Sequence, residues 1–533
     1  MAPLVIGGLA LLALILFDLG PPLAFNDDWL YAWLVRRLLD GHGLHAFPEQ
    51  APPALVQTLW AALLTLGHPD QRLLRLTAVP FVLLAAVSSA YMARRLGANR
   101  FWAVVAGVSL VSGPIFLGAS TSFMTEPFFI GLLMAAAAAG VAWLEDGRGR
   151  LACVLLTGLT CLERQYGAGI AGAMTVAFLL RQLSFSGRPT SSSDWRWLGT
   201  LWAAVAAGLI LPVALGLSSP VEGAVLKSLL QHKFDPVVRA TTPLPGMLGF
   251  LLLPFAVAVT LPGTKDGPGS RWGRRSGPAV GLRTVLGLLI FAVGLGGIAL
   301  MATHLLSGKT IFPGNEWSAL GLNPPSILAG TKPDLFSAPV FATIEAVCAL
   351  SFVVLALGGA RRWAEAALRP AGLFLIVIAV SQFLPMLERG GLERYYLPVA
   401  APLLPLAAAI ASHGRSGRGW AIATLAVGLV LYAAGQQDYE AWQSARDQAA
   451  HLAYRTVPPA NVWGGYETFA VYVEIPVFER TGNLTRPMSP EEPVPTLLGP
   501  LHITATLQFA RRGDPRPGYD YSSLASGRIV VAR

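Results

Sequence analysis

The sequence predicts a bundle of transmembrane helices that carries a small α/β domain at its C-terminal end. The 533 residues are 54% hydrophobic and only 13% charged, whereas about a quarter of the residues in a soluble domain carry charge. The apolar residues form repeated runs of roughly 17–25 residues, the length that crosses the hydrocarbon core of a bilayer. Together these observations indicate a mainly α, multi-pass integral membrane protein.

We expect about thirteen spans from the length and hydropathy of these runs. The first run lacks a basic leader and a small-residue cleavage site, so it is expected to be an uncleaved span rather than a signal peptide. One long helix over 151–180 would bury Glu163 and Arg164 in mid-bilayer, so two short spans are expected there. The spans lie near 4–20, 71–92, 101–119, 123–144, 150–165, 166–183, 197–217, 244–262, 284–304, 340–358, 370–387, 395–412 and 418–434.

Basic residues fall on alternate loops between these spans. Because cytoplasmic loops retain positive charge, this pattern places the N-terminus in the cytoplasm and the C-terminal domain outside it. A bacterial inner or plasma membrane is the expected location. The basic loops hold Arg94, Arg95 and Arg100; Arg148 and Arg150; Arg181, Arg188 and Arg196; Lys265, Arg271, Arg274 and Arg275; Arg361, Arg362 and Arg369; and Arg415 and Arg418.

The net charge of +9 does not indicate a nucleic-acid partner. Its arginines are scattered over short loops, whereas nucleic-acid binding needs a continuous basic stripe. The three cysteines lie in apolar runs and suggest neither a disulfide framework nor a metal site. Membrane lipids are therefore the surroundings that the composition predicts.

The chain divides into a transmembrane domain over 1–434 and an extracytoplasmic soluble domain over 435–533. The second part changes character: 469–475 and 528–532 read as short strands and 438–454 as a helix. In the first part, the outer loop 21–70 holds two amphipathic stretches that we expect to lie in the membrane interface as helices. They are 28–40 and 52–67, and the Pro52-Pro53 pair is expected to open the second helix.

The acidic pair Asp27-Asp28 follows the first span directly. Adjacent carboxylates repel each other, which suits one of them to act as a general base. The same residues also suit a helix N-terminus, where a carboxylate caps the first turn and is favoured by the helix dipole. Both interpretations hold if one Asp caps the helix and the other acts in catalysis.

Three further motifs place charged residues at the outer ends of spans. Glu126 opens the fourth span, where the helix dipole alone would favour it. Arg164 lies at a hairpin tip, where it either binds a phosphate bidentately or pairs with Glu163. Arg394 precedes Tyr395 and Tyr396, which also suit an interfacial belt. All these motifs fall on one face of the membrane, whereas a transporter would more often place ionisable groups near the midplane.

The motifs resemble those of the GT-C superfamily of membrane glycosyltransferases. The similarity is greatest to the branch that contains protein mannosyltransferases and the bacterial aminoarabinose transferase of lipid A. In the first outer loop it rests on Asp27-Asp28 with Tyr31, Arg37-Leu-Leu-Asp-Gly-His-Gly, Leu64-Thr-Leu-Gly and Arg72-Leu-Leu-Arg75-Leu. Elsewhere it rests on Thr125-Glu126-Pro127, Leu162-Glu-Arg164-Gln165 and Glu393-Arg394-Tyr395-Tyr396-Leu-Pro398.

The resemblance implies an inverting transferase that takes a sugar from a polyprenyl-phosphate donor on the extracytoplasmic face. The acceptor would be an envelope lipid, a polysaccharide or a protein. Asp27 would activate the acceptor hydroxyl, with Asp28 as the second acidic residue of the pair and Glu126 across the cavity. Arg164 and Arg394 would bind the donor phosphate. Tyr31, Gln165 and Tyr395 lie in the matching motifs as expected substrate contacts.

Three questions remain open at the level of sequence. Some relatives of this kind use a divalent metal and others do not, and one Asp-Asp pair does not decide between them. A lipid or oligosaccharide flippase is an alternative function, although the predicted spans contain few polar residues in their middle. A non-catalytic membrane assembly protein is another. Removing the charges of the acidic pair would abolish a transferase and barely affect a scaffold.

Overall fold

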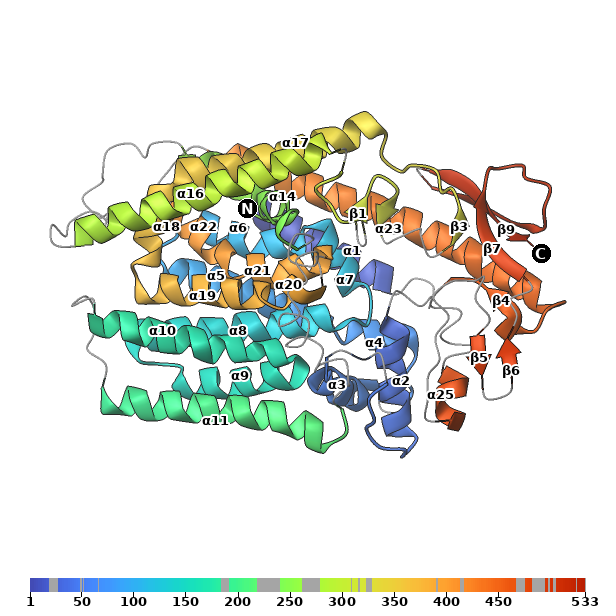
Figure 1. Ribbon diagram of the computed structural model, residues 1–533, viewed down its shortest axis with the longest axis horizontal. Helices are drawn as coiled ribbons and strands as arrows, with labels where there is room; N and C mark the ends of the chain where they lie inside the picture. Colours follow the sequence, from blue (N-terminus) through green and yellow to red (C-terminus); the bar gives the residue numbers. More distant parts are fainter. Residues whose placement is uncertain are drawn as a thin grey trace.

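The computed structural model is a helical bundle with a β-sheet packed at one end (Figure 1). Most of the helices run along the long axis of the molecule. The structure describes residues 1–18, 27–47, 50, 52–65, 67–183, 191–217, 240–260, 279–307, 309–314, 317–322, 328–389, 392–412, 417–465, 475–481, 494–496, 499–501, 505–523 and 525–532.

Helices occupy the predicted spans throughout the described residues, so the protein is an integral membrane protein of helical type. Six helices are long and apolar enough to cross a membrane, or eight if two bent pairs each count as one span. The figure of about thirteen spans therefore stays a prediction. The unbroken helices are α1 Ala2–Asp18, α5 Val79–Arg95 after the short α4 Gln71–Leu76, α8 Thr125–Asp146, α9 Arg150–Glu163, α10 Gly169–Leu183, α11 Ser192–Ala214, α16 Ala279–Leu306, α19 Pro370–Phe383 and α23 Arg418–Tyr454.

Proline interrupts several of the remaining spans, because it lacks an amide donor and clashes with the preceding turn. Helices α6 Arg100–Val111 and α7 Pro114–Ser120 meet at an angle of 58°. A bend of 56° separates 393–400 from α22 Leu403–Ala411, and Pro402 is the N-cap of α22. The 393–400 segment consists of η6 Glu393–Tyr396 and α21 Leu397–Ala400, and the one-turn helix α20 Met386–Arg389 precedes it. Two other spans are broken. One consists of α14 Leu244–Leu251, η3 Leu253–Phe255 and α15 Ala256–Thr260, and the other of α17 Ala338–Val353, a π-helical turn at Val354–Gly358 and α18 Gly359–Ala367.

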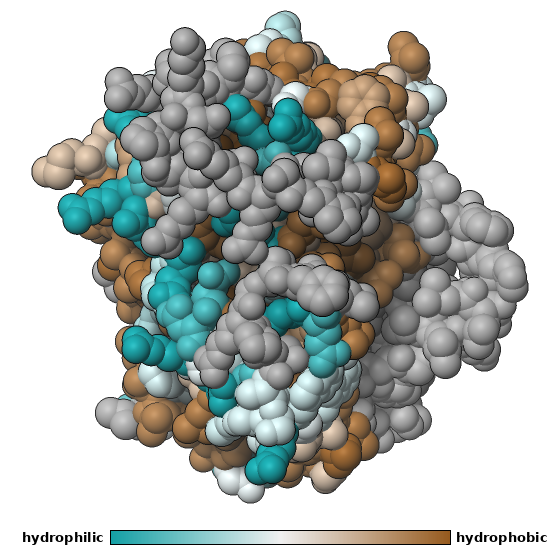
Figure 2. All heavy atoms as spheres, turned by 90° about the vertical axis from the view of Figure 1, so that its left-hand side faces the viewer, coloured by the Kyte–Doolittle hydropathy of each residue, from teal (hydrophilic) through white to brown (hydrophobic). Residues whose placement is uncertain are grey.

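The two ends of the bundle differ in chemistry. At one end, which we call the arginine end, the C-termini of α5, α8 and α10 meet the N-termini of α6, α9 and α11. Ion pairs join neighbouring helices there: Arg95 pairs with Asp146, and Arg150 pairs with Asp194 at 2.8 Å. Figure 2 looks onto this end, where hydrophilic side chains gather between hydrophobic flanks. The opposite end, which carries the β-sheet, is called the sheet end.

Two short helices lie across the sheet end, close to the positions predicted for interfacial helices. Helix α2 spans Asp28–Leu39 and packs against α3, Leu55–Thr65. The second helix begins at Leu55 rather than at Pro52-Pro53, so the proline pair precedes the helix instead of opening it. Leu63 is 65% exposed on α3, which leaves an apolar surface suited to the membrane interface.

The described part of the predicted C-terminal domain contributes four strands to a mixed five-stranded sheet. Its strand order is β3-β7-β9-β8, with β4 also paired to β7. The long strands β7, β8 and β9 are antiparallel, whereas β3 and β4 run parallel to β7. The strands are β3 Ala329–Gly330, β4 Val462–Trp463, β7 Ala505–Ala510, β8 Gly518–Ser522 and β9 Ser526–Ala532; shorter elements are β1 Trp317–Ser318, β2 Gly321–Leu322, α25 Ile475–Thr481, β5 Val494–Thr496 and β6 Gly499–Leu501.

The expected strand at 528–532 lies within β9, and the expected helix at 438–454 lies within α23. Of the other expected strand, 469–474 lies outside the described residues, and Ile475 begins helix α25. Strand β3, which also pairs with this sheet, comes from the loop before α17, far from the C-terminal region in sequence. Strand pairing of this kind depends on long-range contacts that no local pattern carries.

Helix α23 joins the bundle to the sheet without a break over 37 residues. At about 1.5 Å per residue, it is about 55 Å long. Its C-terminal half packs against β8 and β9, and the Trp442 ring meets the Phe509 ring at 5.4 Å. The predicted domain division at 434/435 therefore falls inside one continuous helix.

A buried ion pair fixes the loop before α17 to this helix. Lys332 Nζ lies 2.6 Å from Asp438 Oδ2 and donates a hydrogen bond of 2.7 Å to the Leu320 carbonyl. The Ser523 hydroxyl donates to Asp438 Oδ1 at 2.5 Å. Both charged side chains are 1% exposed. One carboxylate thus connects α23, the loop that supplies β3, and the turn between β8 and β9.

We predict that Asp438→Ala strongly destabilises the protein, because it leaves the Lys332 ammonium buried without its counter-ion. The expected loss is roughly 3–5 kcal/mol in the free energy of unfolding. Replacing both residues, as Lys332→Met with Asp438→Leu, should restore much of the loss. Thermal melting of the purified protein in detergent micelles measures both effects. Equal melting temperatures for Asp438→Ala and wild type would contradict the assigned role of the pair.

Candidate active site

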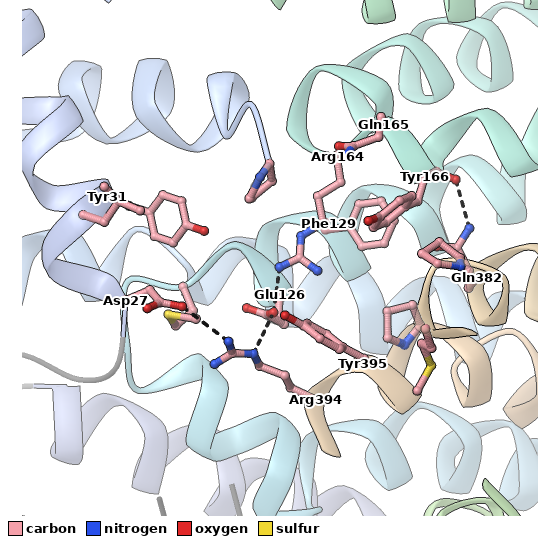
Figure 3. A pocket seen from close by; sticks show the side chains of 16 residues that line it. Asp27, Tyr31, Glu126, Phe129, Arg164, Gln165, Tyr166, Gln382, Arg394 and Tyr395 are labelled. Carbon is pink, nitrogen blue, oxygen red and sulfur yellow. Dashed lines mark hydrogen bonds and ion pairs between the residues drawn. The ribbon is translucent and has the colours of Figure 1, made fainter. Parts of the chain in front are cut away.

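A cavity of about 260 Å³ opens at the sheet end, where the ends of several helices converge (Figure 3). The helices around the cavity contribute side chains from near their ends. The backbone groups at a helix end have no partners within the helix, and the end carries a partial charge. Seven of the eight residues named as candidates from the sequence line this cavity: Asp27, Tyr31, Glu126, Arg164, Gln165, Arg394 and Tyr395.

The Glu126 carboxylate lies between the two arginines. Its Oε1 atom is 2.6 Å from Arg164 Nη2 and 3.5 Å from Arg394 Nε. Glu126 is fully buried and opens α8, where the helix dipole favours a negative charge. A single buried carboxylate therefore holds two guanidinium groups, from the residue after α9 and from η6, against the same point of the cavity wall.

Arg164 reaches the cavity because the chain turns sharply after α9. Glu163 ends α9, and Arg164 is extended, with φ −146° and ψ 133°. The next residues form the 3-10 turn η1, Gln165–Ala168. A Cβ atom on Gly167 would lie 2.8 Å from the backbone nitrogen of Cys161, so the turn can fold back only where the side chain is absent.

Arg164 and its neighbour Glu163 point in different directions. Arg164 Nε donates to the Thr125 hydroxyl at 2.9 Å, and the guanidinium lies over the Phe129 ring. Glu163 instead faces α3 and accepts a 2.9 Å hydrogen bond from the backbone amide of Gln57. Of the two interpretations drawn from the sequence, the contacts described here favour a cavity-facing Arg164 over a pair with Glu163.

Arg394 makes a second link, to the first outer loop. Its Nη2 atom lies 3.4 Å from Asp27 Oδ2, and its guanidinium lies over the ring of Tyr395. The preceding residue, Glu393, is fully buried and accepts a hydrogen bond from the backbone amide of Gly314. In this motif too, one charged residue faces the cavity while its neighbour holds a loop.

The two residues of the acidic pair are separated in the same way. Asp27 is the N-cap residue of α2, but its side chain makes no capping hydrogen bond and lies at the cavity. Asp28 is fully buried away from the cavity lining. It accepts a 2.9 Å hydrogen bond from Gln71 Nε2 and lies 3.6 Å from Arg75 Nη2, both on α4. Asp28 thus fixes the start of α2 to α4, while Asp27 faces the cavity.

Tyr31 enters the cavity from the first turn of α2, opposite the two arginines. Burial raises the pKa of the Tyr31 hydroxyl above its ordinary value, and the neighbouring Asp27 carboxylate raises it further. The hydroxyl therefore stays protonated at neutral pH. A protonated phenol in this position can donate a hydrogen bond to an oxygen of a bound molecule.

Sequence reasoning missed part of the lining, notably Phe129, Tyr166, Gln382 and Met386. Gln382 lies in an otherwise apolar helix, α19, and donates a 3.0 Å hydrogen bond to the Tyr166 carbonyl. A polar side chain in an apolar helix was the available signal, because such residues usually face a protein interior or a cavity. The aromatic residues and Met386 carried no signal that separated them from ordinary lipid-facing or core positions.

The described part of the chain does not assemble a divalent-metal site. Within it, no group of three or more His, Cys, Asp or Glu residues could hold a metal ion. The two carboxylates of the cavity lining, Asp27 and Glu126, each face a guanidinium. Guanidinium groups beside both carboxylates suit the binding of an anion such as a phosphate.

No protein-family model matches the chain, and no curated protein sequence matches it. Solved structures resemble it. ArnT from Cupriavidus metallidurans bound to undecaprenyl phosphate is 14% identical with a TM-score of 0.41, over 99% of this chain and 97% of that chain. The oligosaccharyltransferase AglB from Archaeoglobus fulgidus, in complex with an inhibitory peptide and a dolichol-phosphate, is 14% identical with a TM-score of 0.43. That match covers 93% of this chain and 61% of AglB.

We predict that Glu126→Ala destabilises the protein, because two buried guanidinium groups lose their shared counter-ion. The expected loss is roughly 3–5 kcal/mol in the free energy of unfolding. The control is Glu365→Ala, which removes an (i, i+4) surface pair with Arg361 and should cost at most about 1 kcal/mol. Thermal melting in detergent micelles compares the two. If the Glu126 variant melts no lower than the Glu365 variant, the carboxylate does not hold the arginines.

Proposed function

We propose that the chain is a glycosyltransferase that moves a sugar from a polyprenyl-phosphate donor to a hydroxyl group of a lipid, glycan or protein. One observation carries the proposal: a single cavity is lined by the Asp27 carboxylate, 3.4 Å from Arg394, and by Arg164, and Glu126 contacts both arginines. A carboxylate suits a general base, and paired guanidinium groups suit a phosphate. The donor type follows from the resemblance of the motifs.

The proposed reaction is a direct displacement at the anomeric carbon of the sugar. The acceptor oxygen forms a bond to that carbon, while the bond from the carbon to the phosphate oxygen breaks. The hydroxyl proton passes to Asp27, which later releases it to water. The bonding electrons leave with the polyprenyl phosphate, so its phosphate gains negative charge. Attack opposite the leaving group inverts the anomeric configuration.

Arg164 and Arg394 are the residues that we propose to stabilise the leaving phosphate. Charge that develops in a transition state is stabilised best by groups already in place. Both guanidinium groups are buried and held by Glu126, and Arg164 is held further by Thr125. Tyr31 is proposed to donate a hydrogen bond to a phosphate or sugar oxygen. Gln165 and Tyr395 complete the polar wall that a sugar would contact.

Asp28 has a different proposed role from Asp27, although the sequence alone placed both in the catalytic pair. Its carboxylate binds Gln71 and Arg75 and is absent from the cavity lining. Asp28 is therefore proposed as a positioning residue that sets the start of α2. The general base is Asp27 alone.

We place the cavity on the extracytoplasmic face. It lies at the sheet end, opposite the arginine end where the loops predicted to be cytoplasmic gather. Positive loops are retained on the cytoplasmic side. Helix α3, with its exposed leucines, belongs to the first outer loop and lies at the same end. A lipid-linked sugar would meet the cavity there, at the membrane surface.

We predict that Asp27→Asn abolishes sugar transfer, with a fall of at least about 100-fold, because the acceptor loses its general base. A deletion strain complemented with wild type, Asp27→Asn or Asp28→Asn provides the test. Mass spectrometry of glycolipids, envelope glycans and glycoproteins should reveal one sugar-sized mass that wild type restores and Asp27→Asn does not. Asp28→Asn should retain more transfer and lower the melting temperature.

Two outcomes of that comparison would count against the proposal. If both Asn variants restore the wild-type profile while all proteins insert normally, the acidic pair is structural and the mechanism is wrong. If the deletion changes no glycan but changes the distribution of a lipid between leaflets or the assembly of a complex, the chain is a flippase or an assembly protein.

We predict that Arg164→Gln and Arg394→Gln each slow transfer by roughly 100-fold, because the leaving phosphate loses a charge-assisted hydrogen bond. The turnover number of the purified enzyme with saturating donor measures the effect on chemistry. Arg150→Gln is the matched control: it breaks the ion pair with Asp194 at the arginine end and should leave turnover unchanged. Wild-type turnover in both cavity variants would exclude these arginines from the reaction.

A further inference from the structure

Arg394 contacts two carboxylates at once in the structure. Its Nη2 atom is 3.4 Å from Asp27 Oδ2, and its Nε atom is 3.5 Å from Glu126 Oε1. These are the groups proposed above as the general base and as the anchor of both arginines. The base and the phosphate-binding guanidinium are therefore paired with each other through Arg394 Nη2 (Figure 3).

The charges of the cavity bear on how this pairing responds to a donor. Among the described residues that line it, Asp27 and Glu126 balance Arg164 and Arg394. The phosphodiester of a lipid-linked sugar adds a third negative charge. A donor phosphate that approaches Arg394 Nη2 competes with Asp27 for it, because two anions against the same nitrogen atom repel each other.

Of the two carboxylates, Asp27 is the one that can leave Arg394 more easily. Its side chain is 29% exposed, whereas the side chain of Glu126 is fully buried. Glu126 also keeps Arg164 at 2.6 Å, a shorter contact than either of those to Arg394. A partly exposed carboxylate recovers water contacts when it leaves its partner, whereas a buried one would lose its counter-ions in a desolvated place.

We infer that Arg394 is a switch between the two substrates: it pairs with Asp27 while the donor is absent, and the donor phosphate takes its place and frees Asp27. The inference rests on the proposed function and deepens it. A carboxylate held by a guanidinium is a weaker proton acceptor than a free one. Asp27 therefore activates an acceptor hydroxyl only after the donor has bound, which makes the binding order donor first and acceptor second.

The experiment measures how tightly undecaprenyl phosphate, the probe for the donor phosphate, binds the purified full chain in lipid nanodiscs. Four proteins form a cycle: wild type, Asp27→Asn, Arg394→Gln and the double variant. Asp27→Asn should bind the probe roughly three- to tenfold more tightly, because it removes the competitor for Arg394. Arg394→Gln should bind it more weakly. In the Arg394→Gln background, Asp27→Asn should change the affinity less than about twofold.

Asp520→Asn is the matched control. It also removes one carboxylate that pairs with an arginine, Arg528 at 3.1 Å, but in the sheet. Its affinity for the probe should equal that of wild type. Melting curves of all variants verify that each is folded, and Asp27→Ala should reproduce the result of Asp27→Asn.

The outcomes separate the inference from the proposed function. Unchanged or weaker binding by Asp27→Asn would overturn the switch, even if the chain transfers sugars. Equal tightening with and without Arg394 would also overturn it, because simple repulsion between Asp27 and the phosphate would then explain the effect. Folded wild-type protein that does not bind the probe at all would overturn the proposed function, and the inference with it.

Discussion

The buried carboxylate of Glu126 is the point on which the arrangement of the cavity depends. Three segments that are distant in the sequence meet there: α8, the turn after α9, and η6. Two guanidinium groups brought this close would repel each other without a shared anion. The helix dipole at the start of α8 adds to the negative charge and favours the same position. One ion triad therefore links the bundle to the chemistry that its end can support.

In three of the motifs around the cavity, two neighbouring charged residues have different roles. Asp27, Arg164 and Arg394 face the cavity, whereas Asp28, Glu163 and Glu393 bind backbone or side chains that hold the adjoining loops. Each pair lies at a helix terminus, where the backbone changes direction and consecutive side chains diverge. The member that faces away from the cavity fixes the segment on which the cavity-facing member must be placed accurately. Proposed catalysis and local stability thus share the same short motifs.

Hydropathy and charge were enough to predict the membrane bundle, and the motifs were enough to name the charged residues that line the cavity in the described part of the chain. Asp27, Glu126 and Arg394 could be named because charged residues at the ends of apolar spans are costly and conspicuous. The role of Asp28 could not, because it depends on Gln71 and Arg75 beyond an intervening helix. Gln382 and strand β3 were missed for the same reason: a cavity wall and a strand pair form through contacts between distant segments.

Because α23 is continuous, the number of residues in it sets which of its faces meets the sheet. Each residue turns an α-helix by about 100° and advances it by about 1.5 Å. One residue inserted in the middle would rotate the face that meets the sheet away from Lys332, whereas four would restore the orientation with a shift of about 6 Å. Insertions and deletions within α23 are therefore compatible with this packing only when they keep the helical repeat.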